Sequence, residues 1–132
     1  SKDLSYYWTL AYMTPGQSPN LWHRQVVTQW KPILWFVQGK YEGPMVSDVI
    51  RSDANDKRFH DWGQSESGMR TLVERFTKPG DCILDPFLGG GTTAIAALSL
   101  QRRFIGIDIN EHNINITKGR IGEWIANAAT ER

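Results

Sequence analysis

The sequence predicts an α/β fold with parallel strands joined by a helix. Residues 82–84 form an apolar run too short for a helix, directly after Lys78-Pro79-Gly80, so they are expected to form a strand. A glycine-rich turn, an alanine-rich helix and a second apolar run over 104–108 follow. This order is typical of two parallel strands with a helical crossover.

The first half of the chain predicts two further strands. Residues 6–13 and 32–37 are aromatic and aliphatic on both alternating faces, which is typical of strands buried on both sides. We expect an antiparallel hairpin within residues 1–40, followed by a loop over 41–60. The link 21–31, which contains Trp22 and Arg24, either reaches a bound ligand or is a solvated hairpin loop with packed tryptophans.

Two helices are predicted in the second half. Met69, Leu72, Val73 and Phe76 recur with helical spacing and are expected to be core residues of one helix. The last helix is expected over 111–128. Its packed face is predicted to consist of Ile114, Ile121, Trp124, Ile125 and Ala128.

The turn from Asp85 to Thr93 carries the strongest functional signal. Its three consecutive glycines, 89–91, have no Cβ atoms, so the backbone can approach a ligand and adopt positive φ. Thr92 and Thr93 are expected to cap the following helix. The first N–H groups of that helix would favour a carboxylate or phosphate.

Asp108 ends the second apolar run and is the expected partner of the glycines. A carboxylate there can accept hydrogen bonds from ribose hydroxyls, and its spacing is close to the roughly 20 residues of such units. The glycines fit neither a dinucleotide fingerprint nor a P-loop. Asp85 would repel phosphate and attract an ammonium or a sulfonium, so the expected cofactor is S-adenosylmethionine, which carries both cations and a ribose.

Composition suits a single domain over residues 1–132, with 40% hydrophobic and 22% charged residues. No apolar run could cross a bilayer, no signal peptide is visible and there is one cysteine, so a cytoplasmic protein is expected. The three histidines lack the spacing of a metal site, and we expect no metal. The net charge of +1 does not indicate a nucleic-acid partner.

The motifs resemble those of one enzyme family. Residues 85–93 resemble the Asp-Pro-Phe-x-Gly-x-Gly-Thr-Thr motif of bacterial and phage DNA amino-methyltransferases, which modify adenine N6 or cytosine N4. Residues 103–110 resemble the family's next segment, in which the acid after Gly-Ile holds the ribose. Residues 60–65 followed by 69–76 resemble the segment before the glycine loop in members with circularly permuted motif order.

The resemblance implies a Rossmann-like S-adenosylmethionine-dependent methyltransferase fold with three α/β/α layers. It implies double-stranded DNA as the partner of the complete enzyme, and the cofactor-binding unit would occupy residues 61–132. The methionine side of S-adenosylmethionine is assigned to Asp85, Phe87, Gly89, Gly91 and Thr92, its ribose and adenine to Asp108 and Ile109, and further contacts to His60 and Gln64.

Family members hold the target amine with an Asn/Asp/Ser-Pro-Pro-Tyr/Phe tetrapeptide. None of the six prolines here is adjacent to another. We therefore expect a C-terminal portion that is inactive alone, with no catalytic residue and an incomplete sheet. Its open strand edge would favour a homo-oligomer or association with the N-terminal portion. The alternatives are a non-catalytic methyltransferase-like module and another nucleotide-dependent enzyme.

Overall fold

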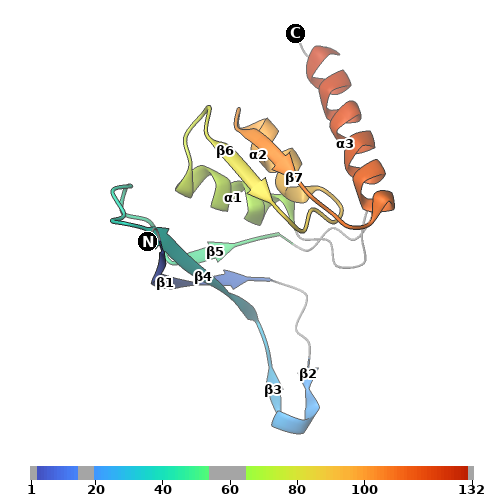
Figure 1. Ribbon diagram of the computed structural model, residues 1–132. Coiled ribbons are helices and arrows are strands. Elements are labelled where there is room, and N and C mark those ends of the chain that lie inside the picture. Colours follow the sequence, from blue (N-terminus) through green and yellow to red (C-terminus); the bar gives the residue numbers. More distant parts are fainter. Residues whose placement is uncertain (1–2, 15–19, 54–64, 131–132) are drawn as a thin grey trace. The chain divides into compact units, whose positions relative to one another are not determined.

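The computed structural model describes residues 3–14, 20–53 and 65–130 (Figure 1). The chain divides into two compact units, Ser1–Ala54 and Asn55–Arg132. Each unit has its own strands, and the residues of the glycine-rich turn belong to the second.

The first unit contains a three-stranded sheet in the order β4-β1-β5. Strand β1 (Leu4–Met13) pairs antiparallel with β4 (Trp30–Gln38), which confirms the predicted strand pair. Strand β5 (Val49–Arg51) pairs parallel with β1. The prediction of a loop over 41–60 is wrong for these three residues, because a strand so short has no alternation to detect in the sequence.

Strand β1 is not buried on both faces as predicted. Leu10 and Tyr12 are buried together with Ile50 of β5, whereas Tyr6 and Trp8 are about half exposed. The reason is that β5 pairs only with residues 11–13 of β1, so the first half of the strand lacks that neighbour. Burial raises the pKa of the Tyr12 hydroxyl.

The link between β1 and β4 contains a small hairpin. Strands β2 (Asn20–Leu21) and β3 (Val26–Val27) pair antiparallel around a short 3-10 helix, η1 (Trp22–Arg24). Gln25 closes the turn in the left-handed conformation, with φ of 55°. The side chain of Trp22 is 80% exposed, so the predicted hairpin exists but this tryptophan is not packed.

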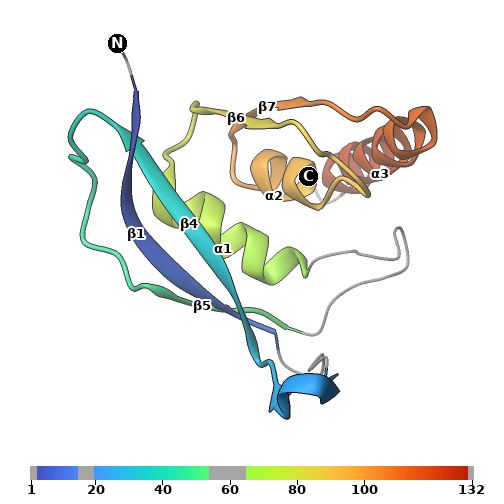
Figure 2. The same ribbon diagram turned by 60° about the horizontal axis from the view of Figure 1, so that its bottom comes forward.

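The second unit contains the expected parallel strand pair. Its elements are α1 (Glu66–Phe76), β6 (Cys82–Asp85), α2 (Thr92–Ser99), β7 (Arg103–Gly106) and α3 (Glu111–Thr130). Cys82 lies opposite Arg103, and Asp85 lies opposite Gly106. Because both strands end at the same edge, the turn after β6 lies next to the turn after β7. Figure 2 shows the three helices on one side of the strand pair.

The core of the second unit lies between the helices and one face of the strands. Ala94, Ala96 and Ala97 of α2 are buried, as is Val73 of α1. Their small side chains allow α2 to pack closely against β7. The prediction that all four apolar residues of α1 are core is therefore correct only for Val73, since the other three are half-buried.

Burial in the second unit is incomplete at two further places. Strands β6 and β7 are buried on one face only, since Leu84 and Ile105 are more than half exposed. Leu84 and Ile105 lie on the face opposite the three helices, and no described element of this unit covers that face. In α3, Ile125 is exposed, and the buried residues are Thr117 and Arg120, because this helix packs on the polar backbone of the glycine-rich turn.

Candidate cofactor site

The candidate site lies at the carboxyl ends of β6 and β7. The strand ladder continues beyond both strands, since the Ile107 N–H donates to the Asp85 carbonyl at 2.8 Å and the Leu88 N–H donates to the Ile107 carbonyl at 2.9 Å. Asp85 and Asp108 therefore end neighbouring strands. Residues 86–91, called the glycine loop below, lie between them.

The glycine loop depends on positive φ at two positions. Gly89 has φ of 53° and Gly91 has φ of 78°. Gly91 is the N-cap of α2, and no side chain caps that helix. The prediction that Thr92 and Thr93 cap α2 is therefore wrong. They are its first two residues, because the left-handed glycine already turns the chain into the helix.

Gly91 also lies against helix α3. An added Cβ at this position would be 2.5 Å from Oγ1 of Thr117. Glycine is thus required here twice, once for its backbone conformation and once for the close approach of α3.

Asp108 is joined directly to the glycine loop. Its Oδ2 accepts hydrogen bonds from the Gly89 N–H at 2.8 Å and from Nδ2 of Asn113 at 3.1 Å. Its Oδ1 accepts one from the Asn110 N–H at 2.8 Å. The structure therefore brings Asp108 next to the glycine loop, as their spacing in the sequence predicted. The hydrogen bond that joins them could not be read from the sequence.

Asp85 lies at the end of β6, where it is half-buried. Its Oδ1 accepts a hydrogen bond from the Phe87 N–H at 3.0 Å. Its other carboxylate oxygen has no partner among the described residues, so it could accept a bond from a cationic ligand. Phe87 and Ile109, which follow the two strands, are highly exposed apolar side chains.

Helix α3 binds the carbonyl groups of the glycine loop. The Thr117 hydroxyl donates to the Gly89 carbonyl at 3.4 Å, and Nη1 of Arg120 donates to the Gly90 carbonyl. In a trans peptide the N–H points opposite to the C=O. The Gly90 N–H, which shares a peptide group with the Gly89 carbonyl, therefore points away from Thr117.

The N–H groups of Gly90, Thr92 and Thr93 have no acceptor within the described ranges. Such unpaired donors at the start of a helix suit a carboxylate or phosphate. The arrangement can hold an anionic group at the loop and cationic or hydroxyl groups at the two carboxylates.

Sequence reasoning missed Thr117 and Arg120. Thr117 lies between Ile114 and Ile121 at helical spacing, so the predicted apolar stripe of α3 passes through it. A polar residue within that stripe was the available signal. His60 and Gln64, which were predicted to contact the cofactor, lie outside the described residues.

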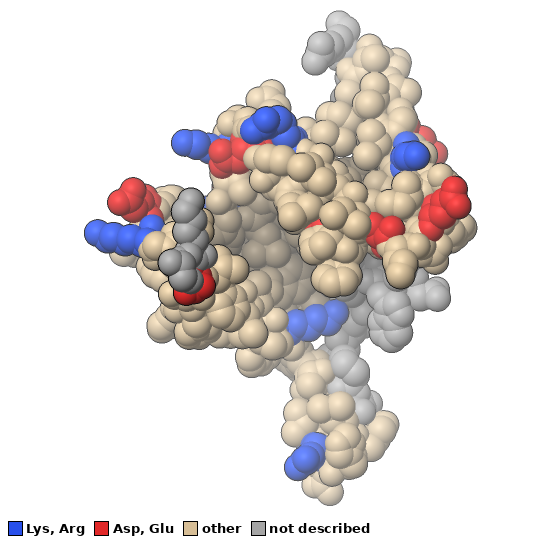
Figure 3. All heavy atoms as spheres, in the orientation of Figure 1, with Lys and Arg blue, Asp and Glu red and all other residues tan. Residues whose placement is uncertain are grey.

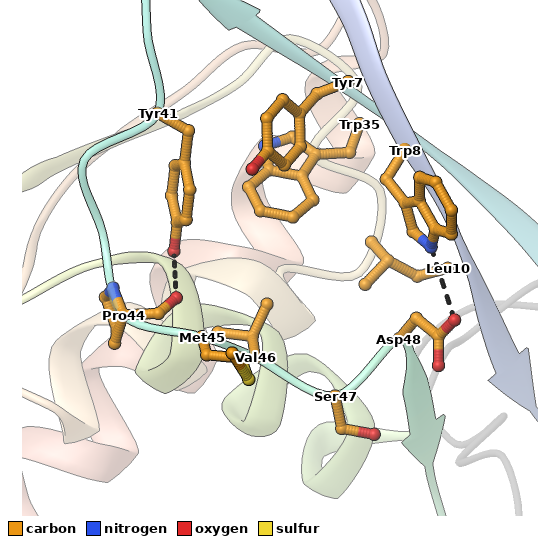
Figure 4. A pocket seen from close by; sticks show the side chains of 10 residues that line it. All are labelled: Tyr7, Trp8, Leu10, Trp35, Tyr41, Pro44, Met45, Val46, Ser47 and Asp48. Atoms are coloured by element: carbon orange, nitrogen blue, oxygen red, sulfur yellow. Dashed lines mark hydrogen bonds between the residues drawn. The ribbon is translucent and has the colours of Figure 1, made fainter.

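The first unit contains a pocket of about 540 Å³ (Figure 4). Tyr7, Trp35 and Tyr41 form one wall, with ring centroids 4.5 to 5.4 Å apart. Nε1 of Trp8 donates to Asp48 at 3.3 Å. The rings pack on one another and hold the segment that leads to β5 against the strand pair. No residue predicted to bind the cofactor lines this pocket.

Within residues 3–14, 20–53 and 65–130, no group of three or more His, Cys, Asp or Glu residues could hold a metal ion. In the same part of the chain, no helix is both long enough and apolar enough to cross a membrane.

The sequence is similar to known DNA methyltransferases. The sequence model described as DNA methylase matches residues 58–119. Type II methyltransferase M.HindIII of Haemophilus influenzae is 34% identical over 101 residues, which cover 76% of this chain and 31% of that protein. Type II methyltransferase M2.DpnII of Streptococcus pneumoniae is 42% identical over 86 residues, covering 61% and 32%. The chain thus spans about a third of the length of these relatives.

Solved structures show the same fold. The complex of M1.HpyAVI with SAM superposes with a TM-score of 0.71 at 24% identity, covering 89% of this chain and 62% of that one. The protein TTHA0409 of Thermus thermophilus, in complex with S-adenosyl-L-methionine, gives a TM-score of 0.68 at 21% identity, covering 91% of this chain and 54% of that one. The Rossmann-like methyltransferase fold is therefore confirmed. With the glycine loop and its two acidic strand ends, these similarities relate the chain to the DNA amino-methyltransferases.

Proposed function

We propose that this chain is the S-adenosylmethionine-binding part of a DNA methyltransferase that methylates the exocyclic amine of adenine or cytosine. The observation that carries the proposal is the glycine loop. Helix α3 binds the carbonyl groups of Gly89 and Gly90, and the unpaired Gly90 N–H points away from Thr117 of that helix. A carboxylate ends the strand on either side of the loop.

The chemistry of these residues fits the cofactor. The unpaired N–H groups of Gly90 and Thr92 suit the methionine carboxylate. Asp85 suits the ammonium or the sulfonium, since a carboxylate attracts either cation. Asp108 suits the ribose hydroxyls, because a carboxylate at the end of the second strand can accept hydrogen bonds from them. We assign Phe87, Gly91 and Ile109 to the same site, together with Gly89.

When bound, the cofactor would supply an activated methyl group. That methyl group would be carried on a positively charged sulfur, which is a good leaving group. Positioning accounts for most of the acceleration in such a transfer. The residues of this chain bind and orient the methyl donor. The chain contains no Pro-Pro pair, so the tetrapeptide that holds the target amine is not among its residues.

We propose duplex DNA as the partner of the complete enzyme, with the β2–β3 hairpin as a contact. The sequence has no Asp or Glu from residue 4 to residue 41, whereas Arg24, Lys31 and Lys40 are cationic. In Figure 3 the projection that corresponds to β2 and β3 shows blue atoms and no red ones. Exposed Trp22 could stack on a base, and the cations could contact phosphates.

We further propose that another polypeptide segment covers the open face of β6 and β7. Leu84, Ile105 and Ile107 are each more than half exposed on these strands or directly after them. Exposed apolar groups on paired strands favour association. The covering segment would be the N-terminal portion of the enzyme or a second copy of this chain. A cytoplasmic location agrees with a partner that is genomic DNA.

Calorimetric titration with S-adenosylmethionine tests the proposal. We expect binding at one site, and no heat from NAD at the same concentration. Failure of the chain to bind S-adenosylmethionine would contradict the function proposed for the glycine loop. Transfer of a labelled methyl group to DNA by the intact protein would then separate an enzyme from a non-catalytic binding module.

A further inference from the structure

Arg120 of α3 is a buried cation behind the glycine loop. Only 8% of its surface is exposed. Burying a guanidinium is costly unless its N–H groups are paired. Here Nη1 donates to the carbonyl of Gly90, and Nη2 donates to Oε1 of Glu66 at 2.5 Å. One planar group therefore connects three parts of the second unit: helix α3, the glycine loop and the first turn of α1.

The contact with Gly90 fixes a peptide group of the loop. Because the peptide is planar and trans, binding the Gly90 carbonyl also sets the direction of the Gly91 N–H. That N–H donates to the Leu88 carbonyl at 3.0 Å and closes the turn before α2. Thr117 does the same for the Gly89 carbonyl and the unpaired Gly90 N–H. Glycines permit many backbone conformations, so a loop of three glycines needs such contacts to keep its N–H groups aligned.

The contact with Glu66 orients the start of α1. Glu66 is the first residue of that helix, where a carboxylate also interacts favourably with the helix dipole. The guanidinium has N–H groups in a rigid fork, so its bond to one partner limits where the other can lie. The start of α1 is therefore held in register with the glycine loop.

We propose that Arg120 is a positioning residue of the cofactor site. It does not touch the cofactor in this proposal. It fixes the peptide group between Gly90 and Gly91, so that the turn closed by the Gly91 N–H keeps the unpaired N–H groups of Gly90 and Thr92 aligned for the methionine carboxylate of S-adenosylmethionine. Glu66 accepts a second hydrogen bond from Arg120. The inference rests on the function proposed above and adds to it a residue on α3 outside the glycine-loop motif.

Arg102 provides a matched control. It is also a buried arginine, with 7% of its surface exposed. Its guanidinium donates to Oγ1 and the carbonyl of Thr77 at 2.9 and 2.7 Å, and to the carbonyl of Leu100. It precedes β7, at the opposite end of the strand from the glycine loop. Replacing it removes a comparable buried network without altering the loop.

The experiment compares Arg120→Gln, Arg120→Lys and Arg102→Gln in the intact protein. Melting temperature reports stability, calorimetry reports S-adenosylmethionine affinity, and the backbone amide resonances of Gly90 and Gly91 report loop geometry without cofactor. We expect both glutamine variants to melt lower. Only Arg120→Gln should lose affinity by about tenfold or more, the factor that one hydrogen bond to a charged group can supply. Arg120→Lys, which keeps the charge and one contact, should recover part of that loss.

Three results would overturn the inference. They are unchanged affinity in Arg120→Gln, an equal loss of affinity in Arg102→Gln, and glycine amide resonances that do not move in Arg120→Gln. If Arg120→Gln does not fold, Arg120→Lys replaces it in the comparison. Affinity and amide resonances of Arg120→Lys equal to those of the unaltered protein would then overturn the inference. Absence of S-adenosylmethionine binding by the unaltered protein would instead overturn the proposed function.

Discussion

At the scale of single residues, Asp108 combines a structural role with a proposed binding role. It accepts the Gly89 N–H, which stabilises the loop, and it is the proposed ribose ligand. Asp108→Ala should weaken S-adenosylmethionine binding by roughly 1.5 to 3 kcal/mol for each hydrogen bond to the carboxylate that is lost. Calorimetry measures this loss. Asp81→Ala is the control, because Asp81 also accepts a backbone N–H, that of Lys78, in a turn before β6. Unchanged affinity in Asp108→Ala would remove this residue from the site.

Gly91 offers a test of the close approach of α3. Gly91→Ala should lower the free energy of unfolding by about 1 to 3 kcal/mol, since the new methyl group would overlap Thr117 and the backbone has positive φ. Gly119→Ala is a matched control within α3, because its Cβ would meet nothing within 4 Å. It should raise stability by about 0.5 to 1 kcal/mol. Equal effects of the two substitutions in urea denaturation would contradict the packing described here.

At the scale of elements, the sequence predicted the strands and helices that are determined by neighbouring residues. The run 82–84, the glycines and the alanine-rich helix each follow from nearby residues, and β6, the loop and α2 were predicted within a few positions. Strand β5 was missed because its three residues are specified by pairing with β1. Arg120 was missed because its partners, Gly90 and Glu66, are distant in sequence. Helix amphipathicity indicates which face is buried, but not that a buried face contacts backbone carbonyls.

The β2–β3 hairpin is the element expected to contact DNA. Arg24→Gln should reduce the slope of log affinity against log salt concentration by about 0.9, the value for one phosphate contact. Trp22→Ala should weaken binding by roughly 1 to 3 kcal/mol, the contribution of one stacked base. Fluorescence anisotropy with duplex DNA and the complete enzyme measures both. Lys118→Gln, at an exposed position of α3, is the control and should leave the slope unchanged. A salt slope in Arg24→Gln equal to that of the unaltered enzyme would exclude a phosphate contact by this residue.

At the scale of the whole molecule, we expect the open face of β6 and β7 to determine whether this chain remains a monomer. Ile105 of β7 is 53% exposed on that face, and Ile125 of α3 is exposed to a similar extent, 56%. If another copy or segment covers the strands, Ile105→Lys should abolish the association, because it would place a charge in an apolar interface. Ile125→Lys should leave it intact.

Sedimentation equilibrium over a wide concentration range measures this difference. The unaltered chain should show a mass that rises with concentration, and so should Ile125→Lys, whereas Ile105→Lys should stay at the mass of one chain. Both isoleucines are already half exposed, so neither substitution creates a large cavity, and a comparable melting temperature would confirm that folding is retained. A strictly monomeric unaltered chain at high concentration would contradict association through this face. Loss of association in both variants would show that apolar surface in general, not the strand face, drives it.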